Sequence, residues 1–262
     1  MNDASAPARA PICQTRIPFD VTPRSLPGIR PLQADDWLMV DEAFGAQMAY
    51  RSELLKARRS DVLSLQDSAR PAAEELLATT LALLRATPER GYRVSDSTVT
   101  RPDGLAITLQ PGDPLGTLGQ LVQEDLCILE KRGQEHVLTG AVLCFPASWR
   151  LDEKFGRPMT VIHAPVPSYD SGISRRVQRL FDGVQLGKPL WRFNRLWYVD
   201  AELYQPRSEN GPPRPRPGKT GPRFFRCEKQ SIFRLPRTQA VIFSIHTFVL
   251  SEQDAPPEAF QD

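Results

Sequence analysis

Histidine is scarce in this chain, so each of its three histidines can be weighed as a group that binds a metal or moves a proton. His163 follows the apolar run 159–162 (MTVI) and precedes the sequence APVP, in which Pro165 and Pro167 fix the backbone. A side chain held at such a rigid end can be aimed into a cavity. His163 is therefore the first candidate for a metal ligand.

The other two histidines are weaker candidates. His136 lies in a polar turn after Gly133, where we expect a solvated side chain. His246 lies in the apolar segment 241–250 (VIFSIHTFVL), where a hydrogen-bonded core histidine is the ordinary interpretation.

Two adjacent carboxylates, Glu124 and Asp125, stand at the head of a predicted strand. Neighbouring side chains of a strand point to opposite faces, so the pair cannot act jointly on one atom. Either one of them faces a cavity and the other solvent, or both simply cap the strand.

Arginines gather at two further places. Arg175 opens a predicted helix shortly after Tyr169, and Arg226 and Arg234 flank a predicted strand. Guanidinium groups can bind carboxylates with two parallel hydrogen bonds. The alternative is that these arginines are merely solvated.

Several classes of protein find no support. The four cysteines include no CxxC pair, which disfavours zinc fingers and iron–sulfur clusters, so we expect buried free thiols. The chain also lacks the motifs of Rossmann, P-loop, zinc-protease and α/β-hydrolase sites. Its 33 basic and 31 acidic residues give a net charge of +2, too little for a general nucleic-acid binder. Without a signal peptide or an apolar run of about 20 residues, a cytoplasmic protein with no membrane contact is expected.

The elements that must position these residues form an α+β pattern. A Pro-rich extended arm is expected over 1–36, a single domain over 37–250, and a fraying tail over 251–262. Within the domain we predict helices over 37–59, 69–85, 115–122, 149–155 and 174–186. Ser148 is the expected N-cap of the fourth helix, and Gly187 the expected end of the fifth.

Predicted strands alternate with these helices and dominate the last third of the chain. They cover 105–109, 124–130, 137–145, 190–203, 224–233 and 241–250, with a hairpin between the second and third and an internal position for the last. Residues 205–223 form a Pro- and Arg-rich insertion, expected to be a flexible loop. The sheet should be mostly antiparallel, with an N-terminal helical part.

Five parts of the chain, in this order, resemble the haem-dependent oxidative N-demethylase α-subunit family. They are the spaced residues Trp37, Asp41, Gln47, Arg51, Leu54 and Leu55, and the segments 122–129 (VQEDLCIL), 145–167 (FPASWRLDEKFGRPMTVIHAPVP), 191–197 (WRFNRLW) and 226–247 (RCEKQSIFRLPRTQAVIFSIHT). The resemblance runs from about residue 17 to residue 250, and its most specific parts are EDLCIL and HAPVP.

This resemblance implies a PAS-like antiparallel sheet with helices packed around a b-type haem. It also implies a monooxygenase subunit that oxidises a small methylated amine, such as dimethylamine, with O₂ and releases formaldehyde. Electrons would come from NADPH through partner proteins that carry FMN and an iron–sulfur cluster. Because this chain has neither a flavin motif nor clustered cysteines, the reductase would be external.

The resemblance also assigns cofactor-binding roles. His163, in the HAPVP segment, would bind the haem iron, with His246 as the second choice. The haem propionates would pair with arginines, in the order of preference Arg226 and Arg234, then Arg175. An apolar wall for the haem would be built by Val142, Phe145, Leu180, Phe181 and Phe243.

A secondary amine arrives as a cation, so a carboxylate near the distal face would hold it and accept its proton. Glu124 or Asp125 would take this role, with the Tyr169 hydroxyl as a possible orienting group. Two other functions stay open: a PAS-like haem-based gas or redox sensor without turnover, and a binding domain that has lost haem.

Overall fold

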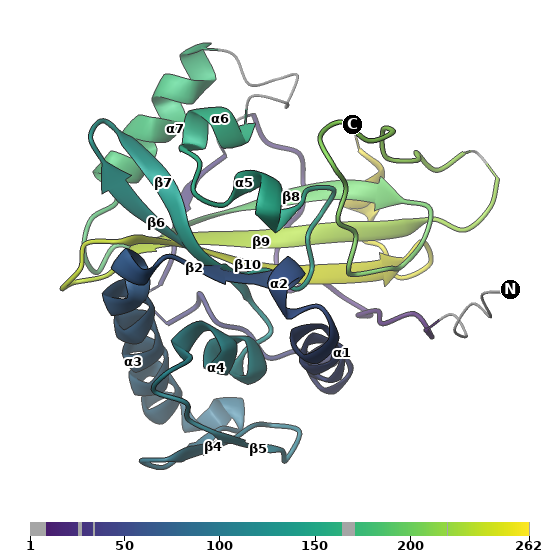
Figure 1. Ribbon diagram of the computed structural model, residues 1–262. Helices are drawn as coiled ribbons and strands as arrows, with labels where there is room; N and C mark the ends of the chain where they lie inside the picture. Colours follow the sequence, from purple (N-terminus) through teal and green to yellow (C-terminus); the bar gives the residue numbers. More distant parts are fainter. Residues whose placement is uncertain (1–8, 26–27, 34, 164–170, 219, 262) are drawn as a thin grey trace, which may run out of the picture.

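The structure is a computed structural model that describes residues 9–25, 28–33, 35–163, 171–218 and 220–261. Its centre is a seven-stranded antiparallel sheet in the order β1-β8-β9-β10-β6-β7-β2 (Figure 1). These strands are β1 Arg30–Pro31, β2 Leu63–Leu65, β6 Asp125–Arg132, β7 Glu135–Val142, β8 Leu190–Tyr198, β9 Phe224–Arg234 and β10 Val241–Ser251. The predicted mixture of helices with a large antiparallel sheet is confirmed, as are the β6–β7 hairpin and the internal position of β10.

Three helices cover one side of this sheet, which we call the α1–α4 face (Figure 1). They are α1 Phe44–Ala57, α3 Arg70–Ala86 and α4 Pro114–Leu121. Their apolar side chains, such as Met48, Leu76 and Leu118, pack with Ile128 and Ile242 of the sheet in one buried cluster. This cluster is the main core of the molecule.

Small elements complete the N-terminal half. A second sheet lies on the far side of α3 and α4 and consists of β3 Arg93–Val94, β4 Thr98–Thr100 and β5 Ala106–Thr108 (Figure 1). Single turns join the larger elements: α2 Arg59–Val62, η1 Asp67–Ala69 and η2 Pro88–Arg90.

The opposite side of the sheet, the α5–α7 face, is covered by the connection between β7 and β8 (Figure 1). Its helices are α5 Leu151–Lys154, α6 Met159–His163 and α7 Ser171–Gly183. Leu151, Met159 and Phe181 pack on Cys127 and Ile245 in a second buried cluster. Within the described residues, no helix is long and apolar enough to cross a membrane.

The N-terminal arm packs on β8, β9 and β10 in a third buried cluster, to which Val21, Phe225 and Phe248 belong. The Phe19 ring stands 5.1 Å from that of Trp191 and 5.8 Å from that of Phe248, measured between centroids. On this side of β10, the pairing with β6 ends at Ile245, and Gln14 forms hydrogen bonds with β10 beyond that point. It does so by donating its backbone N–H to the Val249 carbonyl and accepting the Val249 N–H on its side-chain oxygen.

Several local predictions are wrong. The helix predicted over 37–59 begins only at Phe44, and the strand predicted over 190–203 ends at Tyr198. Ser148 does not cap α5: its φ of 68° turns the chain before the helix, and Arg150 occupies the N-cap position. Gly187 has the expected left-handed φ of 68°, but it lies in the turn Gln185–Lys188, beyond the end of α7. The tail does not fray, because the short helix η3 Pro257–Phe260 packs on the end of β8.

Gly119 marks the closest approach between α4 and its neighbours. A Cβ there would lie 2.6 Å from Cγ2 of Val142 and 3.0 Å from Cδ1 of Leu55. We expect Gly119→Ala to lower the free energy of unfolding by about 1–3 kcal/mol in urea titrations, although alanine favours helix. Gly183→Ala, whose Cβ would meet nothing within 4 Å, is the control. Equal stability of the two variants would contradict this view of the packing.

Candidate functional site

The two carboxylates at the head of β6 are both buried in ionic contacts. Asp125 Oδ1 lies 2.6 Å from Nη1 of Arg51, which comes from α1, and both side chains are almost fully buried. The Asp125 carboxylate also accepts the backbone N–H groups of Cys144 and Phe145 at 2.7 and 2.8 Å. Both oxygens of Asp125 are therefore engaged, and its charge is balanced inside the protein.

His246 lies between two carboxylates. Its Nδ1 is 3.0 Å from Oε1 of Glu124, and its Nε2 is 3.0 Å from Oδ2 of Asp41. Burial alone would lower the pKa of His246, but the hydrogen bonds and charges of Asp41 and Glu124 outweigh it and raise the pKa to about 9. His246 is thus the hydrogen-bonded core histidine that its sequence context predicts. Neither ring nitrogen is free to bind a metal.

Glutamines connect this histidine to the N-terminal arm. Nε2 of Gln14 donates to Asp41 at 2.8 Å, and Nε2 of Gln123 donates to the other oxygen of Asp41 at 2.9 Å. Oε1 of Glu124 also accepts the Met39 N–H, whereas Oε2 is buried without a hydrogen-bond partner in the described part of the chain. We call His246, Asp41, Glu124, Gln14 and Gln123 the His246 network; it lies on the side of the α1–α4 face.

His136 is not solvated as expected: it is 1% exposed. α7 packs over the β6–β7 hairpin, so that the Gln178 amide lies 2.9 Å from His136 Nδ1 and the Phe181 ring stands beside the imidazole. Burial lowers the pKa of His136 and favours the neutral ring.

The α5–α7 face carries polar side chains where a buried sheet surface would be apolar. On β8, Arg192 and Asn194 point away from the face that Trp191 and the arm occupy, because side chains alternate along a strand. Arg192 pairs across the ladder with Gln230, and Asn194 with Glu228.

Three hydrogen-bonding atoms in this region are buried without partners among the described residues: Nε of Arg192, Nε of Arg226 and the hydroxyl of Tyr198. The remaining nitrogens of Arg226 donate to the carbonyls of Leu203 at 3.0 Å and Phe145 at 2.6 Å, and one lies 3.3 Å from Glu228. Burial lowers the pKa of Arg192, opposed by the charge of Glu228. We call Arg192, Asn194, Tyr198, Arg226, Glu228 and Gln230 the polar row. Buried unpaired donors are costly, so the donors of this row suit an acidic group of a ligand.

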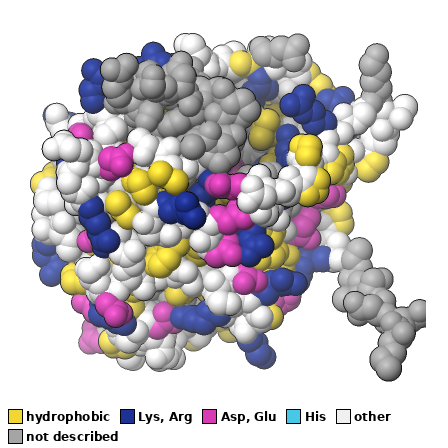
Figure 2. Space-filling view, turned by 45° about the horizontal axis from the view of Figure 1, so that its top comes forward, with side chains coloured by type: hydrophobic (Ala, Val, Ile, Leu, Met, Phe, Trp, Pro, Cys, Tyr) yellow, Lys and Arg dark blue, Asp and Glu magenta, His cyan; other side chains and the backbone are white. Residues whose placement is uncertain are grey.

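An apolar rim adjoins the polar row. Seven side chains of the second cluster are only partly buried: Trp149, Phe155, Ile162, Val177, Leu180, Leu190 and Phe243. They come from the sheet and from the segment that contains α5, α6 and α7. Together, rim and row form an amphipathic surface that fits a flat apolar ligand with an anionic edge. On the outer surface (Figure 2), positive, negative and hydrophobic side chains are interspersed.

The predicted site residues are distributed unevenly around this surface. His163 ends α6, directly after Ile162 of the rim, and Arg175 belongs to α7; their side chains, and Tyr169 as a whole, lie outside what the structure describes. Arg226 lies at the polar row. Arg234 donates to the carbonyls of Phe181, Asp182, Val184 and Gln239 and so holds the C-terminal end of α7.

The proposed apolar wall is divided by the sheet. Val142 and Phe145 belong to the core of the α1–α4 face, whereas Leu180, Phe181 and Phe243 belong to the α5–α7 cluster. The expectation of buried free thiols is confirmed for Cys127, Cys144 and Cys227, whereas the free thiol of Cys13 is only half-buried. Among the described residues, no group of His, Cys, Asp and Glu is arranged to hold a metal ion.

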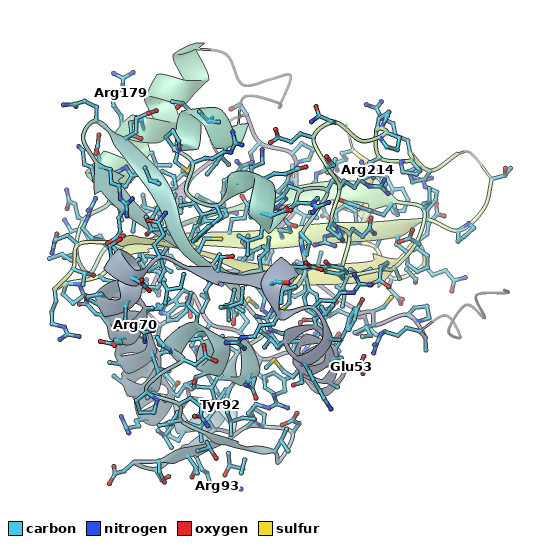
Figure 3. All side chains as sticks on the ribbon, viewed as in Figure 1. Glu53, Arg70, Tyr92, Arg93, Arg179 and Arg214 are labelled. Carbon is cyan, nitrogen blue, oxygen red and sulfur yellow. The ribbon has the colours of Figure 1, made fainter. Side chains whose placement is uncertain are left out.

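Arg192 is the functional candidate that the sequence interpretation missed. The signal was present in WRFNRLW, where aromatic and polar residues alternate with the period of a strand. The loop after β8 contacts the C-terminal end of the strand: Arg214, labelled in Figure 3, donates to the Trp197 carbonyl at 2.6 Å, and its guanidinium carbon lies 4.2 Å from the centroid of the Tyr198 ring.

The raised pKa of His246 predicts how stability depends on pH. Its folded pKa of about 9 exceeds the ordinary value of 6.5, so the stabilisation is complete below about pH 6.5 and is lost as pH rises through 9. We expect the free energy of unfolding in urea to fall with a slope of up to about 1.4 kcal/mol per pH unit between these values.

Two variants isolate this contribution. His246→Gln should lack the decline, and Asp41→Asn should move it to lower pH by removing one partner of the imidazolium. Burial lowers the pKa of Lys229, which pairs with His246 across the ladder, so Lys229 can add its own pH dependence. The quantity to compare is therefore the difference in the free energy of unfolding between wild type and variant at each pH. Parallel stability curves for wild type and both variants would contradict the assignment.

A protein-family model matches residues 28–260 of the chain. The matching family is described as haem-dependent oxidative N-demethylase, alpha subunit-like. Because the match spans most of the 262 residues, the chain belongs to this family, as the sequence resemblance implies. The family description indicates a haem-related oxidative enzyme that works with partner subunits.

Proposed function

We propose that this member of the N-demethylase alpha-subunit-like family binds haem on its α5–α7 face and oxidises a small methylated amine. The observation that carries the proposal is the amphipathic surface of the apolar rim and the polar row. A porphyrin has the matching character, with a flat apolar ring and two propionates at one edge. The PAS-like assignment belongs to this proposal and is supported by the antiparallel sheet with helices α5 to α7 against one face.

The roles of individual residues follow from their positions. Arg192 and Arg226 would receive the propionates, since each has a buried Nε without a partner in the described chain. Arg175 and Arg234 would take part from the side of α7, where Arg234 already fixes the end of that helix. His163 would bind the iron through one ring nitrogen, and its other nitrogen would need an acceptor, often a carbonyl group.

Haem b, when bound, would supply the activation of O₂. The chain's own residues would hold the amine cation and accept its proton. Of the groups expected for these steps, Glu124 and Tyr169 are the ones we propose: Oε2 of Glu124 is free of hydrogen bonds among the described residues, whereas both oxygens of Asp125 are engaged by Arg51 and backbone N–H groups. Glu124 belongs to the His246 network, on the side of the sheet opposite to the proposed haem, so this role requires the amine to reach the inner end of β6 between the two faces.

The substrate class would be dimethylamine and similar amines, with formaldehyde as a product. Electrons would come from an external NADPH-dependent reductase that carries FMN and an iron–sulfur cluster. The alpha-subunit-like family description supports partner subunits in general.

The role of His163 can be tested with purified protein and hemin. His163→Ala should lose axial ligation, seen as a changed Soret band, and should bind hemin at least roughly tenfold more weakly. His246→Asn is the matched control, since both ring nitrogens of His246 already contact carboxylates. A normal spectrum for His163→Ala would sink the assignment. Release of formaldehyde from dimethylamine with O₂ and a reductant would separate an enzyme from a haem-based sensor.

The polar row makes its own prediction. Arg192→Ala should weaken hemin binding roughly tenfold, because a charge-assisted contact to a propionate is lost. Arg93→Ala is the control: Arg93 is exposed on the small sheet at the far end of the molecule (Figure 3). Titration of the Soret absorbance measures both affinities. If the two variants bind hemin equally well, the propionates do not lie on β8.

A further inference from the structure

A cavity of about 380 Å³ lies between the N-terminal arm, α1 and the segment after β8. Apolar side chains make most of its wall, among them Ile12, Leu203, Pro222 and Phe224, and Tyr50 and Glu202 bring polar groups to it. Its volume falls within the range of small-molecule sites. None of the rim residues of the α5–α7 face lines it.

Tyr50 is held so that one ring face is available in this cavity. Its hydroxyl donates to Oε1 of Glu202 at 2.7 Å, and its ring centroid stands 5.7 Å from that of Phe145. Glu202 is fixed in turn, because the same oxygen accepts the Tyr204 N–H at 2.9 Å. Burial and the charge of Glu202 raise the pKa of Tyr50, which keeps the phenol neutral.

A cation already lies over this ring. The guanidinium carbon of Arg9 is 3.9 Å from the Tyr50 centroid, and the same group is ion-paired with Glu53 of α1, which Figure 3 labels. Both side chains of this pair are at least 36% exposed, and exposed ion pairs contribute little stability. Arg9 can therefore be displaced at small cost.

We propose that this cavity is a binding site for a small alkylammonium ion, and that Arg9 occupies the cation position when no ligand is bound. The Tyr50 ring supplies cation–π attraction, the usual way in which proteins recognise alkylated ammonium groups. Glu53 and Glu202 supply opposite charge, and the apolar wall accommodates the alkyl substituents. Arg9 has the charge for this position but leaves the apolar part of the cavity without a partner.

This site is separate from the proposed haem site and does not rest on it. The inference would hold in a chain that bound no haem, and it predicts binding without turnover. A failure of the hemin experiments would leave it intact, and a failure here would leave the haem proposal intact.

The test compares two isosteric probes by isothermal titration calorimetry on the 262-residue chain. Choline carries a quaternary ammonium group, and 3,3-dimethylbutan-1-ol is its neutral isostere. Choline should bind to wild type and bind roughly tenfold more tightly to Arg9→Ala, where the intramolecular competitor is gone. The neutral alcohol should bind to neither.

Two double variants locate the site. Arg9→Ala combined with Tyr50→Leu should lose most of the choline affinity, because the ring face is removed. Arg9→Ala combined with Tyr50→Phe keeps the ring and should bind choline within about threefold of Arg9→Ala. This phenylalanine variant also shows that a loss in the leucine variant is not a general loss of folding. Equal affinity of wild type and Arg9→Ala, equal binding of both probes, or undiminished binding by the leucine variant would overturn the proposal.

Discussion

Two buried positive charges determine how the layers of this molecule fit together. Arg51 meets Asp125 at 2.6 Å, and His246 lies 3.0 Å from both Asp41 and Glu124. Removing one partner of such a pair leaves the other charge buried and costs about 3–5 kcal/mol. These contacts connect α1, β6, β10 and the segment before α1, and so hold α1 against the sheet.

The two faces of the sheet differ in how completely their side chains are buried and paired. The α1–α4 face has a closed core, and its buried charges are mostly matched by their partners. The α5–α7 face has partly buried aromatic and aliphatic side chains beside guanidinium groups whose Nε atoms are unpartnered in the described chain. A ligand with an apolar body and an acidic edge would satisfy both. The family to which the chain belongs uses haem, which is such a ligand.

Local patterns predicted the elements well, because periodicity alone identifies a helix such as α3 or a buried strand such as β10. Contacts between distant segments were not predictable. Nothing in the sequence indicates that Arg51 meets Asp125, 74 residues away, and this contact is why Asp125 does not face an open cavity. His136 was misjudged for the same reason, since it is α7 that buries the hairpin. Arg192 could have been found from the alternation in WRFNRLW.

Hydrogen exchange with and without hemin tests most directly whether haem lies on the α5–α7 face. β1 pairs with only the first residues of β8, so the outer amides further along β8 should exchange readily in the free protein. Bound hemin should slow amide exchange in β8 and in α5 and α6, while exchange in α1 and α3 stays unchanged. Protection confined to α1 and α3, or no protection anywhere, would contradict haem binding on the α5–α7 face.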